Sequence, residues 1–138
     1  MEIKIIDQSL SVADQVVALD LPAIAAAGYK SLLCNRPDAE GPDQPAFAAI
    51  EAAAAGAGLQ AAYLPIVPGA VSDDYVAQFQ ALLDQMPKPV LAYCRTGMRS
   101  ATLWALSEGA RGRALPEILT STKSAGYDLS GLASRIAG

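Results

Sequence analysis

Short apolar runs alternate with longer amphipathic or alanine-rich segments along the chain. The apolar runs predict strands at residues 2–6, 10–12, 29–35, 60–67 and 89–93. The segments between and after them predict helices at residues 20–28, 46–55, 72–86, 101–106, 116–126 and 132–136. Strands separated by helices favour right-handed crossovers. The pattern therefore predicts an α/β fold, with a mainly parallel sheet flanked by helices on both faces.

Composition narrows the class of protein. The chain has 138 residues, 52% hydrophobic and 17% charged, which suits one domain spanning residues 1–138. Fourteen acidic and ten basic residues give a net charge of −4 without a basic cluster, which argues against a nucleic-acid partner. Glycine and proline interrupt the apolar stretch at 46–71, so no membrane span is expected. The start resembles no signal peptide, and two cysteines make no disulfide framework, so we expect a cytoplasmic protein.

The segment Cys-Arg-Thr-Gly-Met-Arg-Ser, residues 94–100, joins the predicted strand at 89–93 to a helix. Backbone amides converge at the N-terminal end of a helix, which carries partial positive charge. We therefore expect Cys94 to ionise more readily than a free thiol and to act as a nucleophile. Ligands of parallel sheets bind beyond the carboxyl ends of the strands, which is where this segment lies. The alternative is that Cys94 is a small apolar residue ending a buried strand.

Each residue of this loop has a predicted role. Gly97 can adopt a positive φ, so the chain can turn tightly enough to point successive amides inward. Arg99 offers a fixed fork of donors to an oxyanion, and Ser100 can donate to the thiolate or cap the helix. Cys94, Arg99 and Ser100 form the predicted catalytic set. The predicted substrate contacts of the loop are Arg95, Thr96, Gly97 and Met98, with the Arg95 side chain directed outward.

No cofactor or metal is predicted. The chain has no histidine, its two cysteines are sixty residues apart, and no glycine-rich dinucleotide motif follows a strand. Cys34 is either a buried structural thiol or a partner that resolves an oxidised or persulfidated Cys94. Trp104 is expected to pack its helix against the sheet.

The order of elements, the loop at 94–100, the segment at 35–45 and Ala-Gly-Tyr-Asp-Leu at 125–129 resemble the phosphatase-like domain of beta-lactamase hydrolase-like proteins. The resemblance covers nearly the whole chain. It implies an architecture like that of tyrosine and dual-specificity phosphatases, and a hydrolase in which Cys94 attacks a phosphoester. Members of the family occur alone or joined to metallo-beta-lactamase-like or flavin-dependent sulfide-oxidising domains. The resemblance therefore also implies a redox or sulfide-oxidising partner enzyme.

The resemblance further implies that the strand at 29–35 lies beside the strand at 89–93. The polar segment that follows residues 29–35 would then border the cysteine site. In that position Asn35, Arg36 and Asp38 are candidate substrate contacts. The same residues also suit a turn, with Pro37 fixing φ and Asp38 accepting hydrogen bonds from nearby amides.

Two features depart from the tyrosine phosphatase pattern. Tyrosine phosphatases have five residues between cysteine and arginine, whereas this chain has four, the length that rhodanese sulfurtransferases use. Tyr93 stands where tyrosine phosphatases have a histidine, and residues 64–69 contain no aspartate to protonate the leaving group. Acids elsewhere that could serve are Asp38, Glu40, Asp43, Asp73 and Asp74. The last two also suit the start of a helix, where negative charge is favoured.

Three functions are compatible with these residues. A phosphatase-like hydrolase would use Cys94 to attack a phosphoester. A rhodanese-like sulfurtransferase would carry a persulfide on the same sulfur, taken from a sulfane-sulfur donor. A non-enzymatic module would bind a small anion or report on the oxidation of Cys94. In the first two cases the substrate is a small anion.

Overall fold

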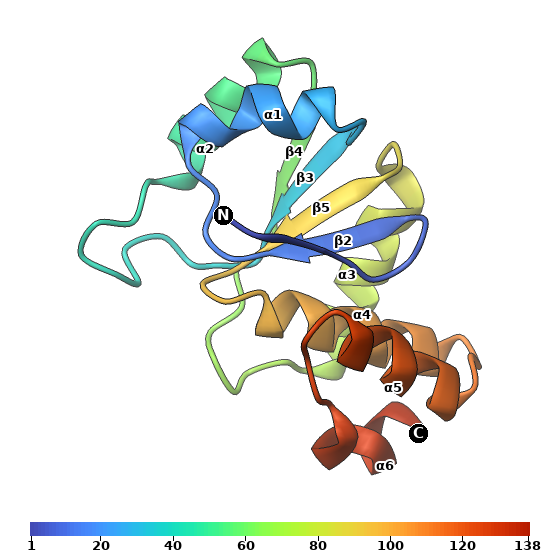
Figure 1. Cartoon of the computed structure of the whole chain (residues 1–138). Helices are drawn as coiled ribbons and strands as arrows, with labels where there is room; N and C mark the ends of the chain where they lie inside the picture. Colours follow the sequence, from blue (N-terminus) through green and yellow to red (C-terminus); the bar gives the residue numbers. More distant parts are fainter.

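The computed structural model describes residues 1–138 and contains a five-stranded sheet with helices on both faces (Figure 1). The strands are β1 (Ile3–Ile5), β2 (Leu10–Ala13), β3 (Ser31–Cys34), β4 (Gln60–Tyr63) and β5 (Val90–Tyr93). Their order across the sheet is β1-β2-β5-β3-β4. Only the pair β1–β2 is antiparallel. The predicted mainly parallel α/β fold is confirmed.

The helices divide between the two faces of the sheet (Figure 1). One face is covered by the short turn η1 (Ala18–Asp20), α1 (Leu21–Ala26) and α2 (Phe47–Gly56). The other face is covered by α3 (Asp73–Gln85), α4 (Met98–Ala110), α5 (Leu115–Ser124), η2 (Ser130–Leu132) and α6 (Ala133–Ile136). None of these helices combines the length and the apolar character that crossing a bilayer requires.

Two elements differ most from their predicted bounds. The strand expected at residues 60–67 ends at Tyr63, because Pro65 has no N–H to continue the ladder. The amides of Leu64 and Ile66 still donate to the Cys34 and Asn35 carbonyls at 2.9 Å each, so this segment follows β3 past the end of the sheet. Helix α4 continues to residue 110, four residues beyond its predicted end.

Helix α4 lies at the centre of the larger core. Its residues 100–107 are all buried, and Trp104 is 1% exposed, which confirms that Trp104 packs within the core. Phe79 of α3 and Ile118 of α5 are fully buried in the same cluster. A helix buried on most sides is held rigidly by packing. The loop that precedes α4 therefore starts from a fixed support.

Helix α3 begins as the sequence predicts. The Ser72 hydroxyl accepts a hydrogen bond from the Tyr75 amide at 3.3 Å, and Asp73 and Asp74 lie in the first turn. Negative charge and a side-chain acceptor at this end both favour the helix.

Strands β3 and β5 are parallel neighbours, with Cys34 opposite Tyr93 in the register. The segments that follow these two strands consequently leave the same edge of the sheet side by side. This arrangement confirms the implied pairing of residues 29–35 with residues 89–93.

Candidate active site

The loop after β5 closes around the sulfur of Cys94. Its Sγ accepts a hydrogen bond from the Gly97 amide at 3.1 Å, and the residue is fully buried. Cys94 belongs to neither of the two apolar core clusters. The side chain therefore points into the loop, toward the Gly97 amide, and not into the apolar interior.

Gly97 is the N-cap of α4 and has φ +92°, a conformation that disfavours any residue with a Cβ. A Cβ here would also collide with the Tyr127 hydroxyl and lie 3.0 Å from its Cζ. The Tyr127 hydroxyl donates to the Thr96 carbonyl at 2.9 Å. Burial raises the pKa of Tyr127 to about 12, so this donor keeps its proton at neutral pH. Residue 127, from the segment after α5, thus braces the loop from outside.

The guanidinium of Arg99 is held mainly by Glu40. Nη1 and Nη2 of Arg99 donate to the two carboxylate oxygens of Glu40 at 2.8 and 2.7 Å, and Nη1 also donates to the Ile66 carbonyl at 2.9 Å. Three of the five N–H donors of the guanidinium are therefore engaged. The remaining donors, on Nε and Nη2, share the edge that Glu40 leaves free.

The electrostatics of this pair follow from the contact. Hydrogen bonding to Arg99 is the main reason that the pKa of Glu40 lies below its usual value, and Arg36 lowers it further. The pKa of Arg99 is raised, first by its hydrogen bonds to Glu40 and also by its proximity to Cys94. Both groups stay charged at neutral pH, and the guanidinium lies beside the sulfur.

Arg36 and Gln15 extend the network on the far side of Glu40. Nε of Arg36 donates to Glu40 at 3.0 Å, and Nη1 of Arg36 donates to the Gln15 side chain at 3.0 Å. Arg36 is only 8% exposed. It is positioned to hold the Glu40 carboxylate in place, and it also lines a cavity of about 360 Å³ together with Arg99, so its predicted contact with substrate stays a prediction.

Asn35 and Ser100 contact each other in the interior. The Ser100 hydroxyl donates to the Asn35 side-chain oxygen at 2.8 Å, and the Asn35 amide donates to the Leu64 carbonyl at 3.0 Å. Both residues are fully buried. The expected hydrogen bond from Ser100 to the sulfur is not formed, and Gly97, not Ser100, is the N-cap of α4. The geometry places Asn35 away from the surface, where it links β3, the segment after β4, and α4.

Asp38 has the turn role that the sequence also allows, and its carboxylate makes no hydrogen bond with Cys94. Its carboxylate accepts from the Phe47 amide in the first turn of α2 at 2.8 Å, and its own amide donates to the Tyr63 hydroxyl at 2.9 Å. Asp43 and Asp74 are exposed, and Asp73 pairs with Arg135 at 3.3 Å. Among the acids proposed from sequence, only Glu40 contacts a residue of the cysteine loop.

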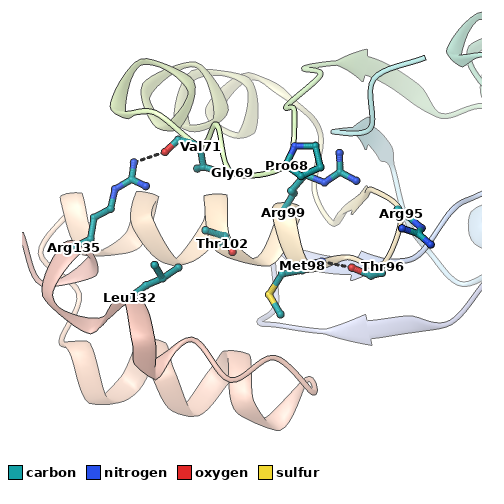
Figure 2. Close-up of a pocket in the computed structure, with 10 residues that line it drawn as sticks. All are labelled: Pro68, Gly69, Val71, Arg95, Thr96, Met98, Arg99, Thr102, Leu132 and Arg135. Atoms are coloured by element: carbon teal, nitrogen blue, oxygen red, sulfur yellow. Dashed lines mark hydrogen bonds between the residues drawn. The ribbon is translucent and has the colours of Figure 1, made fainter. Parts of the chain in front are cut away.

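A cavity of about 450 Å³ opens beside the loop and runs along α4 (Figure 2). Three arginines and no carboxylate line it. The lining residues are Pro68, Gly69, Val71, Arg95, Thr96, Met98, Arg99, Thr102, Leu132 and Arg135. Arg95, Thr96 and Met98 are exposed, and the outward direction predicted for Arg95 is confirmed. A second cavity, of about 360 Å³, shares Arg95 and Arg99 with the first and includes Glu40.

Cys34 and Cys94 are both free thiols. Cys34 lies in the core cluster on the α1–α2 face, and its Sγ donates to the Arg36 carbonyl at 3.3 Å. Burial raises the pKa of this thiol, so it stays protonated. These contacts match the structural alternative for Cys34. No group of three or more histidine, cysteine, aspartate or glutamate side chains is placed to hold a metal ion.

Sequence reasoning missed three residues around this site. Glu40 was considered only as an acid, Tyr127 only as part of a resemblance, and Gln15 not at all. Each acts through a contact with a segment distant in sequence. No local pattern encodes such contacts.

A family model, "Beta-lactamase hydrolase-like protein, phosphatase-like domain", matches residues 2–111. A beta-lactamase hydrolase-like protein of Agrobacterium fabrum is 33% identical over 125 residues, which cover 90% of this chain and 29% of the relative. The chain thus spans less than a third of the length of the curated relatives it matches.

Two solved structures have folds similar to that of this chain. A protein of Neisseria meningitidis, described as a candidate phosphatase, is 35% identical with a TM-score of 0.89, covering 99% of this chain and 96% of that one. The core catalytic domain of a PP-IP phosphatase from S. cerevisiae is 13% identical with a TM-score of 0.72, covering 98% and 83%. The fold is that of tyrosine-phosphatase-like proteins. The chain therefore belongs to the family of beta-lactamase hydrolase-like proteins and matches their phosphatase-like domain.

Proposed function

We propose that this chain is a cysteine-dependent hydrolase of small phosphoesters. The Cys94 thiolate attacks phosphorus, the ester P–O bond breaks, and the leaving oxygen departs with the bonding electrons. Water then attacks the cysteinyl phosphate, which releases inorganic phosphate and returns the thiolate. The observation that carries this proposal is the Cys94 sulfur facing the Gly97 amide, in a loop that ends on the N-terminus of α4.

The surroundings of the sulfur suit phosphoryl transfer. The transition state spreads negative charge over three equatorial oxygens, so catalysis depends on donors already in position. Loop amides at the start of α4 and the free edge of Arg99 can supply such donors. Glu40 occupies the neighbouring edge of the guanidinium, formed by Nη1 and Nη2, so its contact fixes the direction of the free edge.

The proposed enzyme has no obvious proton donor for the leaving group. No carboxylate lines the larger cavity, and two guanidinium groups keep Glu40 ionised because its pKa is lowered. A general acid contributes typically 10²–10⁴-fold to a rate. We therefore expect aryl phosphates and phosphoanhydrides, whose leaving groups depart as anions, to react faster than alkyl phosphates.

A rhodanese-like sulfurtransferase is the second candidate. Only four residues separate Cys94 from Arg99, and the cavity lacks an acid, which persulfide chemistry does not need. The Cys94 thiolate would attack the outer sulfur of thiosulfate, and sulfite would leave with the electrons of the broken S–S bond. Cyanide would then remove the bound sulfur as thiocyanate. A sulfide-oxidising partner enzyme would supply the donor in the cell.

One experiment separates these functions. The purified protein is incubated with p-nitrophenyl phosphate and, separately, with thiosulfate and cyanide. Cys94→Ser is the test variant, and Cys34→Ser, which removes the other buried thiol, is the matched control. Phosphate release that Cys94→Ser abolishes and Cys34→Ser retains supports the hydrolase. Thiocyanate formation with the same dependence supports the sulfurtransferase. Inactivity in both assays contradicts both and leaves an anion-binding or redox-sensing module.

A further inference from the structure

We propose that the cavity beside the cysteine loop binds substrates with two anionic groups, one at the loop and the other at Arg135. The position of the first group rests on the proposed function. The second group defines a subsite at the far end of the same cavity. The ligand class is a small phosphate ester that carries another phosphate or carboxylate.

Positive charge is concentrated in this cavity. The chain has ten basic residues and a net charge of −4, yet Arg95, Arg99 and Arg135 all line this one space. The lining contains no acidic residue. A cleft lined by one sign of charge attracts ligands of the opposite sign. Arg99 also pairs with Glu40 and Arg135 with the exposed Asp73, so what this cavity offers a ligand is Arg95 and the free donors of the other two arginines.

The arginines lie at separate positions along the cavity. Figure 2 shows Arg135 at one end, Arg95 at the other, and Arg99 between them. Arg135 comes from α6 and Arg99 from the first turn of α4, so the two anionic groups would bind at separate positions along the cavity.

Arg135 differs from Arg99 in how firmly it is held. Nη2 of Arg135 contacts the Val71 carbonyl and the Asp73 carboxylate, the latter at 3.3 Å. The side chain of Asp73 is 99% exposed, and such an ion pair contributes little. Nε and Nη1 of Arg135 make no hydrogen bond within the protein. Arg135 thus keeps donors for a ligand, with only one solvated competitor.

The middle of the cavity is apolar. Val71, Met98 and Leu132 lie between or beside the two charged ends (Figure 2). These side chains suit a short hydrocarbon or aromatic spacer, which would connect the two anionic groups. Leu132 and Arg135 also lie beyond the residues 2–111 that the family model matches. The distal subsite therefore belongs to a part of the chain that the family description does not cover.

Calorimetric titration with non-reactive probes tests this proposal. The probes are methylphosphonate, which has one anionic group, and butane-1,4-diyl and hexane-1,6-diyl bisphosphonates, which have two. The proteins are wild type, Arg135→Gln, and the matched control Arg111→Gln. Arg111 is also an exposed arginine in a surface ion pair, with Asp84 at 2.7 Å, but it does not line the cavity.

We expect the dissociation constant of wild type for the tighter-binding bisphosphonate to be about tenfold lower than that for methylphosphonate, because the second anionic group adds one charge-assisted contact. Arg135→Gln should lose this gain while binding methylphosphonate as before, and Arg111→Gln should keep it. Asp73→Asn, which removes the competing carboxylate, should increase the gain by about twofold to threefold.

The outcomes separate the two proposals. If methylphosphonate binds but the bisphosphonates gain no more than their statistical factor of about two, the distal subsite is wrong and the loop site stands. The same conclusion follows if Arg135→Gln, shown by its melting curve to be folded, keeps the full gain. If no probe binds and p-nitrophenyl phosphate is not hydrolysed, the loop site itself is wrong, and the distal subsite falls with it.

Discussion

The loops that follow β5 and β3 leave the same edge of the sheet and meet at Arg99, yet they are built differently. Residues 94–100 are compact and use backbone groups: the Gly97 amide contacts the Cys94 sulfur, and the loop ends directly on α4. Residues 35–46 are longer and use side chains. Glu40 contacts Arg99, and Asp38 contacts the start of α2.

This difference separates two tasks. The loop after β5 holds the Cys94 sulfur against the Gly97 amide, and its shape depends on that one glycine. The loop after β3 presents nothing to the sulfur directly, but its carboxylate fixes the guanidinium that lies beside it. Damage to the first loop should therefore abolish the site, whereas damage to the second should loosen it.

The largest effect is expected from Gly97→Ala. The substitution places a Cβ at positive φ and against the Tyr127 ring, so we expect a loss of about 2–4 kcal/mol in the free energy of unfolding. Any phosphatase activity should fall with it. Gly112→Ala is the matched control, because Gly112 has φ +89° but open space around its Cβ position. Equal losses for the two variants in chemical denaturation would show that contact with Tyr127 is unimportant.

A smaller effect is expected from Glu40→Gln. The variant keeps one acceptor for Arg99 but loses the charge and the bidentate contact, so the guanidinium becomes less well positioned. We expect kcat/KM for p-nitrophenyl phosphate to fall by about 10- to 100-fold, mainly through kcat. Asp84→Asn, which weakens a surface pair with Arg111, serves as the control. Wild-type kinetics for Glu40→Gln would contradict the positioning role.

Tyr127→Phe tests the brace on the first loop more gently than Gly97→Ala does. It removes the hydrogen bond to the Thr96 carbonyl and leaves the ring in place. We expect a loss of about 1 kcal/mol in the free energy of unfolding, measured by urea denaturation. A substantially larger loss would mean that the hydroxyl supports more than this one contact.

The smallest effect is expected in acid. The pKa of Glu40 is below the ordinary glutamate value of 4.5, so the stability from its ionised form is complete above that pH. It is lost as the pH falls through the lowered pKa, where Glu40 takes up a proton in the folded state. The free energies of unfolding of wild type and Glu40→Gln, measured by denaturation between pH 3 and 7, should therefore converge at low pH. Parallel pH profiles would show that the pairing contributes nothing.

The sequence predicted the first loop far better than the second. The apolar run before Cys94, the glycine three residues later and the helix pattern after it are local signals, and each corresponds to a feature of the structure. The alternation of strands and helices likewise predicted the parallel sheet. The strand predicted at 60–67 ends at residue 63, and Pro65 is the local signal for that earlier end.

The rest depended on contacts between distant segments. Ser100 was expected to face the sulfur, but its position in the third residue of α4 turns the hydroxyl toward Asn35. Glu40 and Arg99 are 59 residues apart in sequence, and Tyr127 and Thr96 are 31 apart. Such pairs arise from packing of the whole fold, so residue type and spacing alone do not predict them.

The central claim is that phosphorus becomes bonded to the sulfur of Cys94 during turnover. Mass spectrometry of protein quenched in acid during hydrolysis of p-nitrophenyl phosphate tests it directly. The account predicts one added phosphoryl group, located on the peptide that contains Cys94 and missing from Cys94→Ser. Steady hydrolysis by wild type and Cys94→Ser alike, with no phosphoryl group on that peptide, would contradict it.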